Sequence, residues 1–241
     1  MESAGDLQTC TNCGTKGAGK YCSSCGNSYA IKRITVHGIF HDVFHFFTHL
    51  DKGFAFTLKQ LIVAPGMMQR DYVEGNRSRH QKPFSMFFIC ATVTALLRYW
   101  INLLIMKHYH YGANEGESNF FHQYMVLMHT ILLPLYALVT YLVFYKSKYN
   151  YAELVVFLLY TIGIFFLITV VIHAIRLIWP ELDTDYIELF TLGTYNAISC
   201  INFFNTSNKW LVLIRSLVAL VFVYFIANYA QDVVVGLLKH D

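Results

Sequence analysis

Several long apolar segments constrain the fold of this chain more than any other feature of its sequence. Crossing the roughly 30 Å hydrocarbon layer of a bilayer takes about twenty mostly apolar residues. Four segments meet this requirement plainly or nearly so, at residues 84–106, 124–144, 154–179 and 210–233. Of the 241 residues, 56% are hydrophobic and 17% are aromatic, which is too apolar for a soluble domain of this size. The sequence therefore predicts an all-α, polytopic membrane protein.

A fifth segment, residues 186–204, is diluted by polar side chains and decides the number of crossings. The first thirty residues lack the apolar core of a signal peptide, so we expect a cytoplasmic amino terminus. With five crossings, residues 1–83 and two short turns lie inside and carry 13 of the 18 Lys and Arg residues, in keeping with the positive-inside rule. We therefore expect five crossings. Four follow if residues 186–204 form a re-entrant or surface helix.

Four cysteines precede the apolar segments in the pattern C-x2-C-x8-C-x2-C; they are Cys10, Cys13, Cys22 and Cys25. A glycine follows each pair, and two such hairpins can present four thiolates to one tetrahedral Zn2+. The alternatives are four unrelated thiols and two disulfides, and disulfides require an oxidising compartment. The short polar segment at residues 14–20 cannot build a core, so its folding energy would come from a metal. We therefore expect one zinc ion in a closed site that is structural rather than catalytic.

Residues 36–52 form a predicted amphipathic helix. Its histidines fall within an arc of roughly 120° and apolar residues fill most of the other side; they are His37, His41, His45 and His49. Three interpretations are open: a helix lying on the inner leaflet, a pH-sensitive surface, and a second metal site. That site would use His41, His45 and His49 with Asp51 nearby. We expect the surface helix, because one helix offers an ion at most two or three ligands.

A second short helix is predicted at residues 57–64, where Pro65 and Gly66 end it. A basic run then extends from Arg77 to Lys82, next to the first apolar segment. Such a run attracts anionic lipid headgroups and fixes orientation. Nucleic-acid binding is the rival interpretation, but only four or five charges are involved and they adjoin the bilayer.

A few polar residues interrupt the apolar segments. Arg98 is expected to reach the outer interface beside Trp100. His129, His173 and Asn196 are expected to face the interior of the bundle, because ionisable and amide groups are costly in lipid. No Walker loop, Ser-His-Asp set or HExxH motif accompanies them.

The segment between the cysteines and the first crossing carries a specific pattern, THxDKG…T…L…PG…YxxGxRxxxxxP. It falls on Thr48, His49, Asp51, Lys52, Gly53, Thr57, Leu61, Pro65, Gly66, Tyr72, Gly75, Arg77 and Pro83. With the cysteine pattern before it, this block resembles a family of uncharacterised multi-pass bacterial membrane proteins, catalogued as a domain of unknown function. The resemblance covers Cys10 to about Phe84, with Asn27 where the family usually has glutamine. It implies a bacterial inner-membrane location and no activity.

The expected organisation has three parts: a zinc ribbon and linker at 1–33, juxtamembrane helices at 34–82 and a helical bundle at 83–241. Three classes of function fit it. The first, which we expect, is a scaffold or accessory factor whose exposed ribbon docks a cytoplasmic partner. The second is a transporter or channel with a polar cavity among the crossings. The third is a membrane-embedded metalloenzyme with ligands on residues 37–49.

Overall fold

The computed structural model describes residues 7–26, 28–29, 35, 53–109 and 116–238, and only the backbone at 116–125 and 235–238. The predicted amphipathic helix at residues 36–52 lies outside these ranges. So do the ligands of the second candidate metal site, namely His41, His45, His49 and Asp51.

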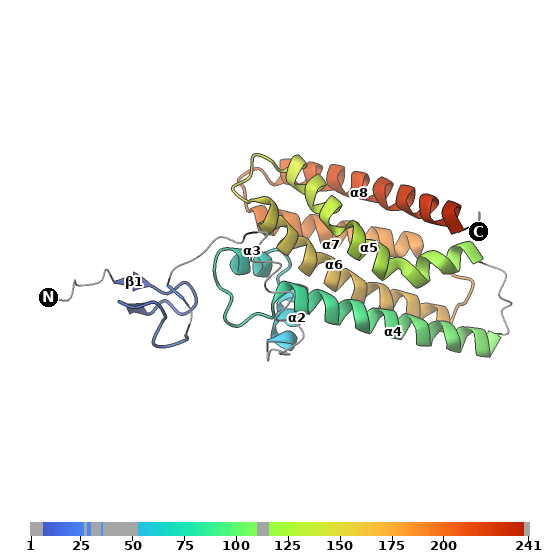
Figure 1. Cartoon of the computed structure of the whole chain (residues 1–241), viewed down its shortest axis with the longest axis horizontal. Coiled ribbons are helices and arrows are strands. Elements are labelled where there is room, and N and C mark those ends of the chain that lie inside the picture. Colours follow the sequence, from blue (N-terminus) through green and yellow to red (C-terminus); the bar gives the residue numbers. More distant parts are fainter. Residues whose placement is uncertain (1–6, 27, 30–34, 36–52, 110–115, 239–241) are drawn as a thin grey trace.

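In the described part of the chain, five long helices run along a common axis and alternate in direction (Figure 1). They are α4 (Pro83–Tyr109), α5 (Gly116–Val143), α6 (Tyr151–His173), α7 (Asp185–Phe204) and α8 (Lys209–Leu238). A single turn of 3-10 helix, η1 (Ala174–Leu177), extends the end of α6. The mostly helical fold predicted from the apolar segments is confirmed.

Four of these helices are long and apolar enough to cross a membrane, namely α4, α5 from Val126, α6 with η1, and α8 to Val234. Helix α7 has 20 residues, but its polar side chains keep it out of this set. Helix α6 is apolar on all sides and is buried on nearly all of them. A helix without a polar face is expected at the centre of a bundle, and α4, α5 and α7 all pack against α6.

The ends of α6 and α7 follow from local chemistry. Asn150 precedes α6, and its side-chain oxygen accepts a hydrogen bond from the Glu153 backbone N–H at 2.9 Å. The Glu153 carboxylate accepts one in return from the Asn150 N–H at 2.8 Å, which completes a capping box. Helix α7 ends at Asn205, whose φ of +42° is the left-handed conformation that commonly terminates helices.

Two short helices, α2 (Phe54–Val63) and α3 (Met67–Val73), pack at the end of the bundle where α4 begins (Figure 1). They confirm the predicted short helix and its end at Pro65 and Gly66. Gly66 has φ +80°, and a Cβ there would collide with the Ser199 carbonyl oxygen and lie 2.9 Å from the Phe203 nitrogen. Only glycine allows the start of α3 to approach the last turns of α7 this closely.

The described amino-terminal region is a small hairpin that carries the cysteines. Strand β1 (Gln8–Thr9) pairs antiparallel with β2 (Lys16–Gly17). A single further bridge joins Tyr21 to Ser28. The side-chain amide of Asn12 donates a hydrogen bond of 2.8 Å to the Ser78 hydroxyl, in the loop between α3 and α4. The hairpin therefore lies at the same end of the bundle as α2 and α3.

Candidate metal centre

Two equivalent turns position the four cysteines. The Gly14 N–H donates to the Cys10 carbonyl and the Gly26 N–H donates to the Cys22 carbonyl, each at 2.9 Å. Both glycines have φ +73°, a conformation that glycine adopts without steric cost. Each Cys-x-x-Cys-Gly sequence therefore closes a tight turn that directs two sulfurs to the same side.

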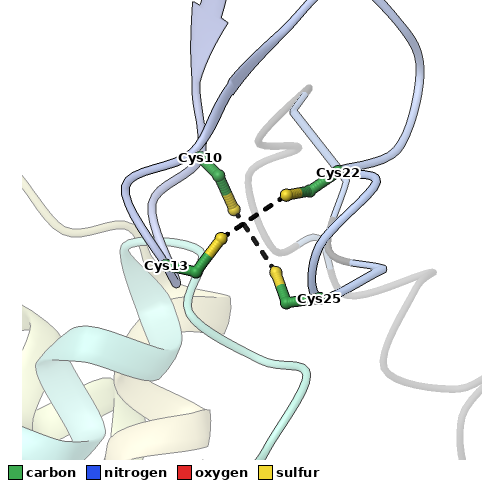
Figure 2. Close-up of side chains that lie close together, drawn as sticks. All are labelled: Cys10, Cys13, Cys22 and Cys25. Atoms are coloured by element: carbon green, nitrogen blue, oxygen red, sulfur yellow. Dashed lines mark hydrogen bonds between the residues drawn. The ribbon is translucent and has the colours of Figure 1, made fainter.

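The four sulfurs meet at one point (Figure 2), and all of them lie within 4.8 Å of one another. The Sγ atoms of Cys10 and Cys25 are 3.6 Å apart, and those of Cys13 and Cys22 are 3.4 Å apart. A tetrahedral ion with metal–sulfur bonds of about 2.3 Å places its ligands about 3.8 Å from one another. A disulfide would bring two sulfurs to about 2.05 Å. The spacing therefore fits a shared metal ion.

The surroundings of the sulfurs favour the thiolate form that binds metals. Hydrogen bonds from the Thr15 hydroxyl and backbone N–H lower the pKa of Cys13 to about 6. The pKa of Cys22 is lowered chiefly by the backbone N–H of Cys25. The Tyr29 phenol lies beside Cys22, and this contact raises the Tyr29 pKa to about 12. Lowered thiol pKa values at two of the four positions make simultaneous ligation easier.

The donor set also limits the chemistry of the cluster. Four thiolates around one tetrahedral ion complete its shell and leave no position for water or substrate. Cys10 and Cys22 are buried, whereas Cys13 is exposed. The cysteines that the sequence singled out thus come together as a candidate structural metal site. The remaining cysteines, Cys90 and Cys200, lie buried within the bundle and away from the cluster.

A second group of polar side chains lies inside the bundle, and its position corrects the prediction for Arg98. Arg98 is 3% exposed, with Nη1 located 3.7 Å from Oε2 of Glu188 on α7. Trp100, in contrast, is 59% exposed. The prediction that Arg98 reaches the interface was wrong because α4 turns this residue towards α6 and α7, where a carboxylate can compensate its charge.

His173 extends this network to the end of α6. Its Nδ1 lies 3.5 Å from Nη2 of Arg98, and its Nε2 lies 2.8 Å from Oδ1 of Asn102. The prediction that His173 faces the interior is confirmed. Glu188 was recognised in the sequence only as a polar residue within a weak segment. Nothing local indicates that it pairs with Arg98, because the pairing depends on which helices are neighbours.

The comparisons with known proteins bear on the segment beside the ribbon. A family model described as "Protein of unknown function (DUF3667)" matches residues 51–95. The resemblance stated from the sequence is confirmed. No curated protein and no solved structure matches the chain. The DUF3667 segment includes α2, α3 and the first half of α4, and it excludes the four cysteines.

The described signature residues of the DUF3667 segment act in packing and hydrogen bonding. The Thr57 hydroxyl accepts a 2.7 Å hydrogen bond from the Gln81 backbone N–H, and a Cβ on Gly53 would lie 2.9 Å from the Arg79 carbonyl oxygen. Arg77 donates through Nε to the Tyr72 carbonyl at 3.1 Å. Leu61 and Tyr72 are buried in the core. These residues therefore fold α2 and α3 onto the bundle, and those of the segment that the structure describes form no convergent catalytic set.

Proposed function

We propose that this protein is a scaffold or accessory factor of the bacterial inner membrane that docks a cytoplasmic partner through its ribbon. The observation that carries this proposal is the closed four-sulfur cluster on an exposed hairpin at one end of the bundle. On the same hairpin Leu7 is 72% exposed and Tyr21 is 68% exposed. Aromatic residues such as tyrosine are enriched in the contact surfaces between proteins, which supports a docking role for this hairpin.

Zinc is the ion we propose for the cluster. Four thiolates in tetrahedral arrangement suit Zn2+, and a cytoplasmic location would keep the cysteines reduced. In this proposal the ion holds the hairpin in shape and takes no part in a reaction.

We further propose five crossings, with the ribbon inside. Glu188, one turn into α7, contacts Arg98 deep in α4. At the other end of α7, the Phe203 carbonyl accepts a hydrogen bond from the Tyr149 hydroxyl, just before α6. The two ends of α7 therefore lie at opposite ends of the bundle (Figure 1). If α4, α5, α6 and α8 cross the membrane, α7 must cross it too, because it returns the chain from the end of α6 to the start of α8.

The basic run next to α4 supports this orientation in a narrower form than the sequence indicated. The Arg77 side chain donates to the carbonyls of Tyr72 and Val73 and is therefore engaged in the fold. Arg79 is exposed and Lys82 is half-buried. We propose that the basic run contacts anionic lipid headgroups, with Arg79 as its exposed member.

Photo-crosslinking in living cells tests the docking role. A benzoylphenylalanine in place of Tyr21 should capture a defined protein, and the product should disappear when Cys22→Ser is added. Tyr186 is 77% exposed and lies at the start of α7, at the end of the bundle opposite the ribbon. The same label in place of Tyr186 should not give that product. Crosslinks from position 21 that survive Cys22→Ser, or that reach lipid alone, would contradict docking by a folded ribbon.

A reporter fusion tests the crossings. A reporter in the turn at residues 205–208 should be cytoplasmic and one following residue 238 should be external. An external signal at 205–208 together with a cytoplasmic signal after residue 238 would mean that α7 does not cross, and a cytoplasmic signal at both positions would mean that α8 does not cross.

The transporter alternative has one observation in its favour, a cavity between α5, α6, α7 and α8. A cavity alone does not show movement across the membrane, so it does not favour a transporter over a scaffold. The metalloenzyme alternative depends on residues 37–49, which the structure does not describe.

A further inference from the structure

The outward face of helix α2 is apolar. The exposed residues of this helix are one lysine and four apolar residues, namely Ala55, Phe56, Lys59, Ile62 and Val63. At about 100° per residue they fall within an arc of roughly 120° centred on the lysine. The buried residues of α2, Thr57 and Leu61, lie on the opposite side. A helix whose outer face meets water is expected to be polar there, so this face calls for an apolar contact.

Contacts on the buried side fix the position of α2 along the bundle. The Gln81 backbone N–H, two residues before α4 begins, donates a hydrogen bond of 2.7 Å to the Thr57 hydroxyl (Figure 1). The Tyr195 hydroxyl donates one of 3.1 Å to the Leu61 carbonyl. Tyr195 is nine residues before the end of α7, so α7 extends about 13 Å further towards the ribbon's end of the bundle. Helix α2 therefore lies beside the bundle, level with the start of α4.

The start of α4 lies at the surface of the bilayer if this helix crosses it. Helix α4 has 27 residues and is about 40 Å long, about 10 Å more than the thickness of the hydrocarbon layer. With this excess shared between its two ends, the first turn of α4 lies at the level of the headgroups. A helix at that depth buries apolar side chains between the headgroups and the acyl chains. The outward face of α2 is therefore placed to contact lipid.

Lys59 favours lipid over a protein partner on this face. Lysine is depleted in the cores of protein interfaces, whereas at a bilayer surface its side chain keeps the methylene groups in apolar surroundings and extends the ammonium to the headgroups. Helix α2 contains no Asp or Glu. We infer that the outward face of α2 binds phospholipid of the leaflet on the ribbon side, with Lys59 at the phosphate of an anionic headgroup. This inference depends on α4 crossing the membrane and not on docking through the ribbon.

Photo-crosslinking identifies the occupant, first in cells and then with the purified full-length protein in vesicles of phosphatidylethanolamine and phosphatidylglycerol. Val63 is 71% exposed, and benzoylphenylalanine in its place should give chains that carry one phospholipid, as detected by intact mass spectrometry. The same label in place of Phe222, which is 54% exposed on α8, is the positive reference, and Tyr21 on the ribbon is the negative one. A product from position 63 that joins two chains or captures another protein overturns the inference. So does the absence of a lipid product there, or an equal yield from position 21.

A charge variant in the same vesicles tests the role of Lys59. Lys59→Gln should lower the ratio of phosphatidylglycerol to phosphatidylethanolamine among the products from position 63 by about fivefold, because one lysine near the headgroups is lost. Lys107→Gln is the matched control and should leave the ratio unchanged, since Lys107 is also exposed but lies in the last turn of α4, at the opposite end of the bundle. An unchanged ratio in Lys59→Gln, or an equal fall in both variants, overturns the assignment of the headgroup to Lys59.

Discussion

The ribbon and the helical bundle differ in what their interiors contain. Of the described ribbon residues, only Cys10 and Cys22 are buried, so the candidate metal ligands are themselves the core. In the bundle, a continuous apolar cluster extends from Leu61 in α2 to Ala227 in α8. The comparison teaches that the proposed metal ion would have to supply the folding energy of the ribbon, whereas the bundle has an apolar core that can stabilise it through packing.

Within the bundle, α6 and α8 show a further contrast. Both are apolar enough to cross a membrane. In the apolar 18-residue stretch of α6, however, 83% is buried in the protein, against 22% in that of α8. In a bilayer, the exposed side of α8 would be covered by lipid or by another protein chain. Hydropathy therefore identifies crossings, but it does not distinguish the central helix from a peripheral one.

Loss of a sulfur ligand should separate the two regions most strongly. Cys22→Ser removes one of four ligands, and zinc binding contributes on the order of 10 kcal/mol to the folding of such small sites. We expect rapid proteolysis within residues 7–29 and an unchanged melting temperature of the bundle. Cys200→Ala, a buried cysteine outside the cluster, is the control and should keep the ribbon resistant. A bundle that melts with the ribbon in Cys22→Ser would break the comparison.

The buried ion pair tests whether packing alone accounts for the bundle. Glu188→Leu leaves Arg98 buried without its carboxylate, which should lower the free energy of unfolding by about 3–5 kcal/mol. The double variant Arg98→Met/Glu188→Leu removes both charges and should recover most of this loss. Steric trapping in bicelles measures both values. A double variant as unstable as the single one would show that the pair has a net stabilising role.

The close approach of α3 to α7 gives a purely steric test. Gly66→Ala combines an unfavourable φ with a collision against α7, and it should cost about 3 kcal/mol. Gly163→Ala in α6 is the matched control, because its Cβ would meet Phe87 Cα at an ordinary 3.5 Å. We expect this control to change stability by less than about 1 kcal/mol. Equal effects of the two substitutions would argue against the packing of α3 on α7.

The smallest effect is expected at the surface pair of Lys148 and Glu74, whose side chains are 2.6 Å apart. Burial acts to raise the Glu74 pKa, but the hydrogen bond and charge of Lys148 outweigh it and the pKa is lowered. A lowered carboxyl pKa stabilises the fold above the ordinary pKa of the group, and the stabilisation is lost as the pH falls through the lowered value. Lys148→Ala should cost under about 1 kcal/mol at pH 7. It should cost less still at acid pH, as followed by thermal unfolding at several pH values.

More of the ribbon than of the bundle could be predicted from the sequence, and the reason is physical. The ribbon's cluster depends on residues at most 15 positions apart, so the spacing of Cys10 to Cys25 and the following glycines was enough to predict it. The short helix α2 and its end at Gly66 were likewise predictable from local signals. The crossings were predicted from composition, with α7 as the weak member.

Contacts between segments that are far apart in the sequence could not be predicted. Arg98 and Glu188 are 90 positions apart, and only the packing of α4 beside α6 and α7 brings them together. The cavity draws on four helices and has no continuous signature. His129 was recognised as a polar residue within a crossing, but its place in the cavity wall depends on how α5 is turned.

X-ray absorption at the zinc edge of the purified full-length protein, with the metal content measured on the same sample, tests the central claim most directly. The account predicts one zinc per chain with four sulfur neighbours at about 2.3 Å. A sample without zinc, or a spectrum requiring nitrogen or oxygen ligands in place of sulfur, would contradict a ribbon held together by Cys10, Cys13, Cys22 and Cys25.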